Sequence, residues 1–241
     1  MDSDAMAPYG QALLDYFNGD AKATVVVERE DGLRSDMPVG AFFREETKFS
    51  LIDQAALALC REHVLDVGAG AGCHSLVLQQ RGHPVLAVDV SPAAVEIMRK
   101  RCVEHAVRAD IFELRDGPFD TLPMMMHGIG MVETLSGLDR FLHNAHRLLS
   151  PRGQIVLDSL DVRETTDPGH LAYQQALRRA GRYVGEIRMR FEYQGQTGPT
   201  FGWLHVDPET LAQRARRANW RCRVVRRETN GDYLAQLEAS A

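Results

Sequence analysis

The chain has 241 residues, of which 44% are hydrophobic and 25% are charged, and this composition is ordinary for a soluble globular protein. Its length suits one sizeable domain with room for an elaborated lid. The formal net charge of −5 and the pI near 6.0 argue against nucleic acid or an anionic membrane as the main partner.

The N-terminal residues and the distribution of cysteines indicate the cellular compartment. The N-terminus carries acidic residues where a secretion signal carries basic ones, and no stretch approaches the roughly 20 apolar residues of a membrane span. The four cysteines are scattered at Cys60, Cys73, Cys102 and Cys222. We therefore expect reduced thiols, a cytoplasmic protein, and no membrane or nucleic-acid partner, with monomer and homodimer both open.

The first sixty residues predict a helix, a strand and a second helix joined by loops. Residues 9–18 indicate a short amphipathic helix, and residues 23–31 indicate a strand that ends in the turn Asp31-Gly32. Residues 37–60 follow as an aromatic loop that leads into a helix. A regular alternation of elements begins only after this segment.

From residue 63, aliphatic strands alternate with helices, a pattern typical of a parallel sheet covered on both faces. The expected strands are 63–68, 84–90, 106–114, 119–126 and 154–162; the expected helices are 73–82, 92–102 and 137–149, the last ended by 150–153. Ser91 can cap the second of these helices, and Pro92 occupies its first position. The repeated βαβ order predicts a doubly wound, Rossmann-like α/β sheet.

The pattern changes after residue 163. We expect a helix at 170–181, a hairpin of strands 186–194 and 200–207 across the Gly-rich residues 195–199, a helix at 208–219, and strands at 221–228 and 232–239. Asn230-Gly231 is a strong tight-turn signal and makes the last two strands antiparallel neighbours. The main sheet should therefore have seven strands and end in an antiparallel hairpin.

The most informative stretch is VLDVGAGAG at residues 64–72, where a strand turns into a helix. Gly68, Gly70 and Gly72 recur at every second position, so the backbone can form left-handed turns and allow a ligand to approach closely. The helix that follows points free N–H groups at a negative group. A dinucleotide fingerprint would need a glycine at the position of Cys73, and an all-parallel dinucleotide domain would not need the terminal hairpin.

Five motifs occur in the order found in the class I S-adenosylmethionine-dependent methyltransferases, and the chain resembles that superfamily. They are VLDVGAGAG, VLAVDVSP, RADIFEL, FDTLPMMMHGIGMV and LLSPRGQIVLDS, beginning at residues 64, 85, 108, 119 and 148. The resemblance covers most of residues 62–160 together with the final helix and hairpin. It implies S-adenosyl-L-methionine as cofactor, S-adenosyl-L-homocysteine as product, and methyl transfer to a small-molecule substrate.

On this resemblance we expect residues 1–241 to form one methyltransferase domain. Its expected parts are an N-terminal extension at 1–44, a cofactor-binding core at 45–163, an insertion at 164–206, and a final helix and hairpin at 207–241. The extension and the insertion are the segments available to form a lid.

The first motif implies contacts to the methionine portion of the cofactor. By similarity to the family, the backbone at Gly68, Ala69 and Gly70 holds that portion. Asp66 supports the loop or binds the ammonium group.

The second and third motifs imply contacts to the adenosine portion. Asp89 ends its strand where a carboxylate can accept hydrogen bonds from both ribose hydroxyls, Val90 packs on the adenine, and Asp110 takes the exocyclic amine. Ile111 contacts the ring through its backbone. The alternative for Asp89 and Asp110 is an ordinary role in a turn at the end of a strand.

His127 follows the fourth strand, where this family lines the methyl-transfer site. Methyl transfer mainly requires a positioned nucleophile, exclusion of water and, for a hydroxyl, removal of a proton. A pKa near 6.5 suits histidine to that last task, so His127 is a candidate general base. The alternatives are a contact of His127 with the cofactor and a cap on its loop, with Gly128 and Gly130 giving the backbone room.

Several other side chains are candidates for the rim of the site or its lid. Rim candidates are Asp158, Asp161 and Arg163, and lid candidates are Tyr9, Tyr16, Phe42, Phe43, Arg44, Trp203 and His205. We predict no metal site, because the histidine pair His143 and His146 has no further ligand nearby. The pair Cys60 and His63 is equally weak evidence for a metal site. The basic run at 214–227 indicates a solvated face, and Met124, Met125 and Met126 indicate core filling.

Two other functions stay open beside methyl transfer. The chain could bind S-adenosylmethionine as a sensor or use its sulfonium for another displacement. It could also be a nicotinamide-dependent oxidoreductase with Asp89 on a ribose, although the Cys73 position and the hairpin argue against that.

Overall fold

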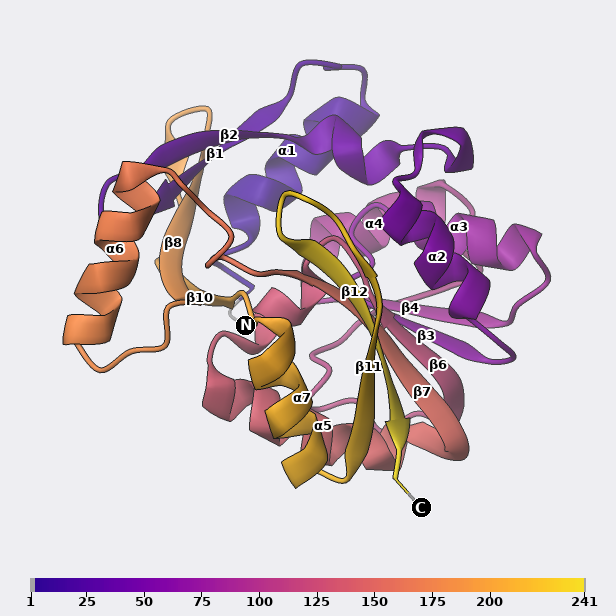
Figure 1. Cartoon of the computed structure of the whole chain (residues 1–241). Helices are drawn as coiled ribbons and strands as arrows, with labels where there is room; N and C mark the ends of the chain where they lie inside the picture. Colours follow the sequence, from indigo (N-terminus) through magenta and orange to yellow (C-terminus); the bar gives the residue numbers. More distant parts are fainter. Residues whose placement is uncertain (1–2, 241) are drawn as a thin grey trace.

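In a computed structural model, which describes residues 3–240, the chain forms two sheets with helices packed around them (Figure 1). The α-helices are α1 (Ala7–Phe17), α2 (Leu51–Leu59), α3 (Cys73–Gln80), α4 (Pro92–Lys100), α5 (Leu135–Leu148), α6 (Pro168–Arg179) and α7 (Pro208–Arg217). The 3-10 helices are η1 (Val39–Phe43), η2 (Glu46–Lys48) and η3 (Gly128–Val132). None of the helices in the described part of the chain has the length and apolar character needed to cross a membrane.

The main sheet has seven strands in the order β11-β12-β7-β6-β3-β4-β5. They are β3 (Val64–Val67), β4 (Val85–Asp89), β5 (His105–Arg108), β6 (Phe119–Met124), β7 (Leu149–Leu160), β11 (Trp220–Arg227) and β12 (Asp232–Ala239). Strands β3 to β7 are parallel, and β12 runs antiparallel to both β7 and β11. The predicted Rossmann-like α/β sheet with its C-terminal hairpin is confirmed.

Alternate residues of each strand point to opposite faces, and both faces are covered. On one face, Val64, Val85 and Val156 belong to clusters formed with α2 and α3. On the other face, Leu65 and Ile155 join the largest cluster, to which α5 and α7 contribute. The strands are therefore continuously apolar until they reach their carboxyl ends.

The helices α2 and α4 begin at residues that cap helices. Ser50 and Asp53 form a complete capping box at the start of α2, and Ser91 caps α4 ahead of Pro92. The helix α5 ends at Leu148, one residue before its predicted end, and residues 150–153 lie inside β7 rather than in a loop. The pairing with β6 is irregular there, between Phe119 and Thr121, and Pro151 and Gly153 are residue types that ordinarily indicate a turn.

The N-terminal extension and the insertion build one antiparallel sheet together, which the sequence did not indicate. Its strands are β1 (Thr24–Arg29), β2 (Arg34–Pro38), β8 (Glu186–Tyr193), β9 (Gln196–Thr197) and β10 (Phe201–Leu204), in the order β10-β8-β1-β2 with β9 beside β8. Strand β2 was not predicted, and only its last two residues, Met37 and Pro38, belong to the expected aromatic loop at 37–60. Helix α6 lies on the outer side of this second sheet (Figure 1).

Close contacts dock the second sheet on the main body. A Cβ on Gly130 in η3 would lie 2.0 Å from Cε2 of Trp203, so only glycine allows the indole of β10 to sit there. The backbone N–H of Leu135 donates to Glu186 Oε1 at 2.8 Å. Helix α1 contacts both α4 and β8. These contacts fix the second sheet over the carboxyl ends of β3, β4 and β6.

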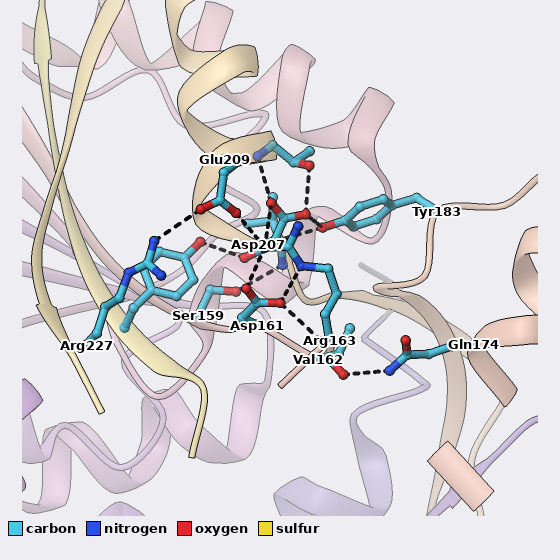
Figure 2. Close-up of polar contacts among 12 residues, drawn as sticks. Ser159, Asp161, Val162, Arg163, Gln174, Tyr183, Asp207, Glu209 and Arg227 are labelled. Atoms are coloured by element: carbon cyan, nitrogen blue, oxygen red, sulfur yellow. Dashed lines mark hydrogen bonds and ion pairs between the residues drawn. The ribbon is translucent and has the colours of Figure 1, made fainter. Parts of the chain in front are cut away.

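A polar network joins the end of β7 to the segments on either side of the insertion (Figure 2). The Arg163 guanidinium donates to Asp161 at 2.7 and 2.6 Å and lies 3.4 Å from Asp207 Oδ1. Tyr183 donates to the other oxygen of Asp207 at 2.6 Å, and Asp207 caps α7. Both aspartates are buried, and the Arg163 guanidinium is the cationic partner that they share.

We expect the substitution Arg163→Met to lower the free energy of unfolding by roughly 2 kcal/mol, because two buried carboxylates lose a charged partner. Arg227→Met is the matched control: that arginine contacts only the exposed Glu209 in this network, so its loss should cost less than about 1 kcal/mol. Urea denaturation of both variants measures the difference, and equal losses would contradict this role of Arg163.

Candidate active site

A cavity of about 470 Å³ lies between the carboxyl ends of the main sheet and the second sheet, a size typical of small-molecule sites. Each of the parallel strands β3, β4 and β6 delivers its following loop to this place. The second sheet forms the opposite wall, and Met6, Tyr9 and Phe42 from the N-terminal extension close one side.

The glycine loop after β3 takes left-handed conformations and leaves a backbone cradle. Gly68 and Gly70 have φ values of +71° and +56°, which glycine adopts without strain. A Cβ on Gly68 would lie 2.5 Å from Met131 Cε, and a Cβ on Gly70 would lie 3.1 Å from the Tyr9 hydroxyl. Gly68 and Ala69 line the cavity, so this backbone faces a ligand directly.

Asp89 lies at the end of β4 beside the same loop. Its two oxygens accept backbone N–H groups, one from Gly70 at 2.9 Å and one from Ser91 at 2.8 Å. Burial raises the pKa of Asp89, although these two donors oppose the shift. A carboxylate has about four acceptor positions, so each oxygen retains capacity for a further donor such as a hydroxyl.

The predicted adenine-side residues also line the cavity. Val90, Asp110 and Ile111 lie there with Ala109 and Phe112. Asp110 accepts the N–H of Phe112 at 2.8 Å, which fixes the turn that follows β5. Apart from Gly70, whose N–H donates to Asp89, the predicted cofactor residues therefore line one cavity, and their acceptors and bare backbone fit an adenosyl ligand with a charged amino-acid tail.

Asp66 lies at the base of the site and not at its open surface. Its carboxylate accepts the Ser75 hydroxyl, and burial raises the pKa of Asp66 against the opposing effects of His74 and Ser75. The structure therefore favours support of the glycine loop, one of the two roles considered for this residue.

A buried ion pair that the sequence did not indicate lies next to Asp66. His74 Nε2 is 2.9 Å from Asp53 Oδ1, and Arg44 Nη1 is 3.2 Å from Asp53 Oδ2. Burial opposes a charge on His74, but the hydrogen bond to Asp53 outweighs it and raises the pKa of His74 to about 10. The same pairing lowers the pKa of Asp53 to about 2 despite its burial.

His127 occupies the loop after β6 and lines the cavity, held by two carboxylates. Its backbone N–H donates to Asp158 Oδ1 at 3.0 Å, and its Nε2 lies 3.0 Å from Asp232 Oδ1. Burial opposes the imidazolium form, but Asp232 and Asp158 together raise the pKa of His127. Burial also raises the pKa of Asp158, to about 6.

His205, which follows β10, meets His127 edge-on with ring centroids 5.4 Å apart. Its Nδ1 is enclosed and has no hydrogen-bond partner among residues 3–240. Burial and the neighbouring charge of His127 lower the pKa of His205 to about 3. The histidine pair therefore holds one charge at most near neutral pH.

Side chains from the second sheet make the remaining wall apolar. Val27, Met37, Met189, Phe191 and Trp203 face the cavity, and the methionines around it are Met6, Met37, Met125, Met126, Met131 and Met189. The prediction of core filling holds for Met124 and Met125, which are buried in core clusters, although Met125 also lines the cavity; Met126 is half-buried and lines the cavity outside those clusters. Methionine side chains adapt to differently shaped apolar ligands.

Only some of the other residues predicted for the lid or the rim line the cavity. Tyr9, Phe42, Trp203 and His205 line the cavity, whereas Tyr16 stacks on Phe43 away from it. Asp161 and Arg163 belong to the network of Figure 2 and not to the rim.

Side chains of the basic run and of the histidine pair noted in the sequence contact other side chains in the structure. Several arginines of the basic run pair with neighbouring acids, as Arg214 does with Asp139 and Arg221 with Glu238. His146 stacks on Trp220. Within the described range, no three histidine, cysteine or acidic side chains are grouped to hold a metal.

The sequence analysis named Trp203 of the second-sheet wall but did not indicate Asp232 or the wall residues Val27, Met37, Met189 and Phe191. Asp232 follows the Asn230-Gly231 turn, where an aspartate ordinarily serves the turn, so no local signal marks it. The wall residues come from strands 150 or more positions apart in sequence, such as β1 and β8, and only their pairing brings them together.

Comparison with known proteins gives the same family throughout. A family model described as a methyltransferase domain matches residues 65–157. The chain is 32% identical to a SAM-dependent methyltransferase from Bacteroides fragilis, solved in complex with S-adenosyl-L-homocysteine. That alignment has a TM-score of 0.85 and covers 99% of this chain and 97% of the other.

Curated relatives match over shorter regions. A demethylmenaquinone methyltransferase from Tropheryma whipplei is 28% identical over 153 residues, 61% of this chain and 62% of the relative. A ubiquinone biosynthesis O-methyltransferase from Pseudomonas paraeruginosa is 30% identical over 118 residues, 46% of this chain and 49% of the relative. The chain thus spans between about half and three fifths of these relatives.

The His74–Asp53 pair predicts a pH-dependent contribution to stability. Because the folded-state pKa of His74 is raised from about 6.5 to about 10, its contribution is complete below pH 6.5 and is lost as the pH rises to about 10. Asp53→Asn should therefore lower the free energy of unfolding by about 3 kcal/mol at pH 6, and the difference from wild type should shrink toward pH 10.

Ser50→Ala is the control for this prediction, because it removes the other half of the capping box and leaves His74 its partner. It should cost about 1 kcal/mol with little dependence on pH. Urea denaturation at pH 6, 8 and 10 makes the comparison. A loss for Asp53→Asn that is the same at all three values would refute a charged His74.

Proposed function

The chain belongs to the S-adenosylmethionine-dependent methyltransferases, and from that premise we propose that it methylates a small, apolar acceptor held between its two sheets. One observation carries the proposal: a single cavity contains both the glycine loop with Asp89 and an apolar wall from the second sheet. The cofactor supplies a methyl group on a positively charged sulfur. Membership of this family leaves the nicotinamide alternative without support.

We assign the cofactor to the loops of the main sheet. Gly68, Ala69 and Gly70 would hold its methionine portion, with Asp66 supporting the loop. Asp89 would bind the ribose. Val90, Asp110 and Ile111 would contact the adenine. Support for this assignment comes from the cavity that all of these residues except Gly70 line, from the left-handed glycine backbone and from the acceptor capacity of Asp89.

The acceptor side is proposed from the chemistry of the opposite wall. Methionine and aromatic side chains there favour an apolar ring compound, and they offer nothing to a phosphate backbone. The curated relatives are named for demethylmenaquinone and for ubiquinone biosynthesis, and an acceptor of that kind is compatible with this wall. His127 and His205 are the polar side chains that would orient it.

We also propose how the chain is organised into a domain and a cover over the cavity. Residues 1–241 would act as one domain in which the segments 1–44 and 164–206 cover the cavity. Contacts of Tyr9 and Trp203 with the loops of the main sheet support this arrangement. We further propose a cytoplasmic enzyme that acts as a monomer or homodimer, without a nucleic-acid partner.

Incubation with methyl-labelled S-adenosylmethionine and a pool of apolar metabolites should yield a labelled product that extracts into organic solvent. Asp89→Ala should lower this transfer at least about tenfold, because each lost hydrogen bond to the ribose is worth about 1 kcal/mol or more. Asp116→Ala, an exposed aspartate outside the cavity, is the matched control and should retain the wild-type rate.

Three other outcomes of this experiment would each contradict a different part of the proposal. Label found only in protein or RNA would contradict the acceptor class. Consumption of the cofactor without a methylated product would show that its sulfonium serves a different displacement. Equal transfer by the wild type and Asp89→Ala would contradict the cofactor assignment.

A further inference from the structure

The terminal hairpin brings one carboxylate to the candidate base from a distant part of the sequence. Asp232 begins β12, 105 residues after His127, and its Oδ1 lies 3.0 Å from His127 Nε2. The other oxygen of Asp232 accepts the side-chain amide of Asn230 at 2.8 Å. The carboxylate is therefore held from both sides and cannot easily leave the imidazole.

This contact determines which nitrogen of His127 faces a ligand. A carboxylate only accepts, so Nε2 must carry the proton in the pair. No hydrogen bond to a residue in the described part of the chain uses Nδ1, while 30% of the side chain is exposed and the residue lines the cavity. The neutral imidazole thus keeps the lone pair of Nδ1 free of described protein donors, on a residue that lines the cavity.

Neighbouring side chains hold the imidazole of His127 in place and determine its electrostatic environment. Asp158 of β7 fixes the backbone of His127 and lies 3.9 Å from Nε2, with the His74–Asp53 pair of α3 and α2 beyond it. The neutral ring of His205 packs edge-on from the second sheet. His127 therefore faces two carboxylates and one uncharged imidazole.

We propose that Asp232 is a positioning residue that makes His127 a general base through Nδ1, and that the acceptor is therefore a hydroxyl or N–H compound. This inference rests on the proposed function. The acceptor atom forms a bond to the methyl carbon while the carbon–sulfur bond breaks and leaves its electron pair on sulfur. The proton of the acceptor passes to Nδ1, and the resulting imidazolium is stabilised by Asp232 and Asp158.

A nuclear magnetic resonance titration tests the inference without a known acceptor. In the wild type labelled with ¹⁵N at histidine, His127, assigned with His127→Gln, should titrate above 6.5 and carry its neutral-state proton on Nε2. His205 should remain neutral throughout the range of folding. In Asp232→Asn the pKa of His127 should fall by about one unit, since an opposite charge within reach favours the protonated form.

Glu238→Gln is the matched control, because it neutralises another carboxylate of β12 that pairs with Arg221 rather than with the site. It should leave the titration of His127 unchanged. A neutral-state proton on Nδ1, or a pKa of His127 that is the same in the wild type and Asp232→Asn, would overturn the inference. The wild-type tautomer decides the question even if Asp232→Asn fails to fold.

Addition of S-adenosyl-L-homocysteine to the same samples separates this inference from the proposed function. Binding by the wild type together with a proton on Nδ1 would overturn the role of Asp232 and leave the cofactor assignment intact. Failure of the wild type to bind would overturn the proposed function itself.

Discussion

The parallel order of β3, β4 and β6 is the constraint on which the rest of the site depends. Parallel strands place their carboxyl ends at one edge, so the glycine loop, Asp89 and His127 must meet there. Those loops expose polar backbone and ionisable groups that a folded core cannot cover with apolar side chains alone. A second sheet, assembled from the N-terminal extension and the insertion, encloses them and leaves a cavity.

Enclosure determines the electrostatics of the cavity. Water is largely excluded from groups such as His74 and Asp158, so each buried charge depends on a specific partner. Asp53 holds the charge of His74 below the glycine loop, and Asp232 with Asp158 favours a charge on His127 at the other end. Carboxylates already placed beside His127 are suited to a reaction in which an imidazolium forms as the acceptor loses its proton.

The sequence was sufficient for features that depend on local pattern. The spacing of Gly68, Gly70 and Gly72, the cap at Ser91 and the turn at Asn230-Gly231 predicted the main sheet and its hairpin, because short-range backbone preferences decide each of them. The cofactor residues followed from the same motifs, and their common cavity is consistent with that prediction.

Features that depend on distant pairing could not be predicted in this way. Strand β1 pairs with β8 across about 160 residues, so nothing near Val27 indicates that it shares a wall with Met189. Asp232 resembles an ordinary turn residue until the hairpin folds back on His127. Met126 follows two core methionines and has the same side chain, and the left-handed backbone at Met126 and His127 accompanies its place in the cavity lining.

We propose that cofactor and acceptor meet in one cavity whose second wall comes from the N-terminal extension and the insertion. A crystal structure of the protein with S-adenosyl-L-homocysteine tests it most directly. We predict adenosine against Asp89 and Ile111, and the sulfur facing the side of the cavity formed by His127, Trp203 and Met189. A ligand bound outside this cavity, or a sulfur turned away from the second sheet, would contradict the account.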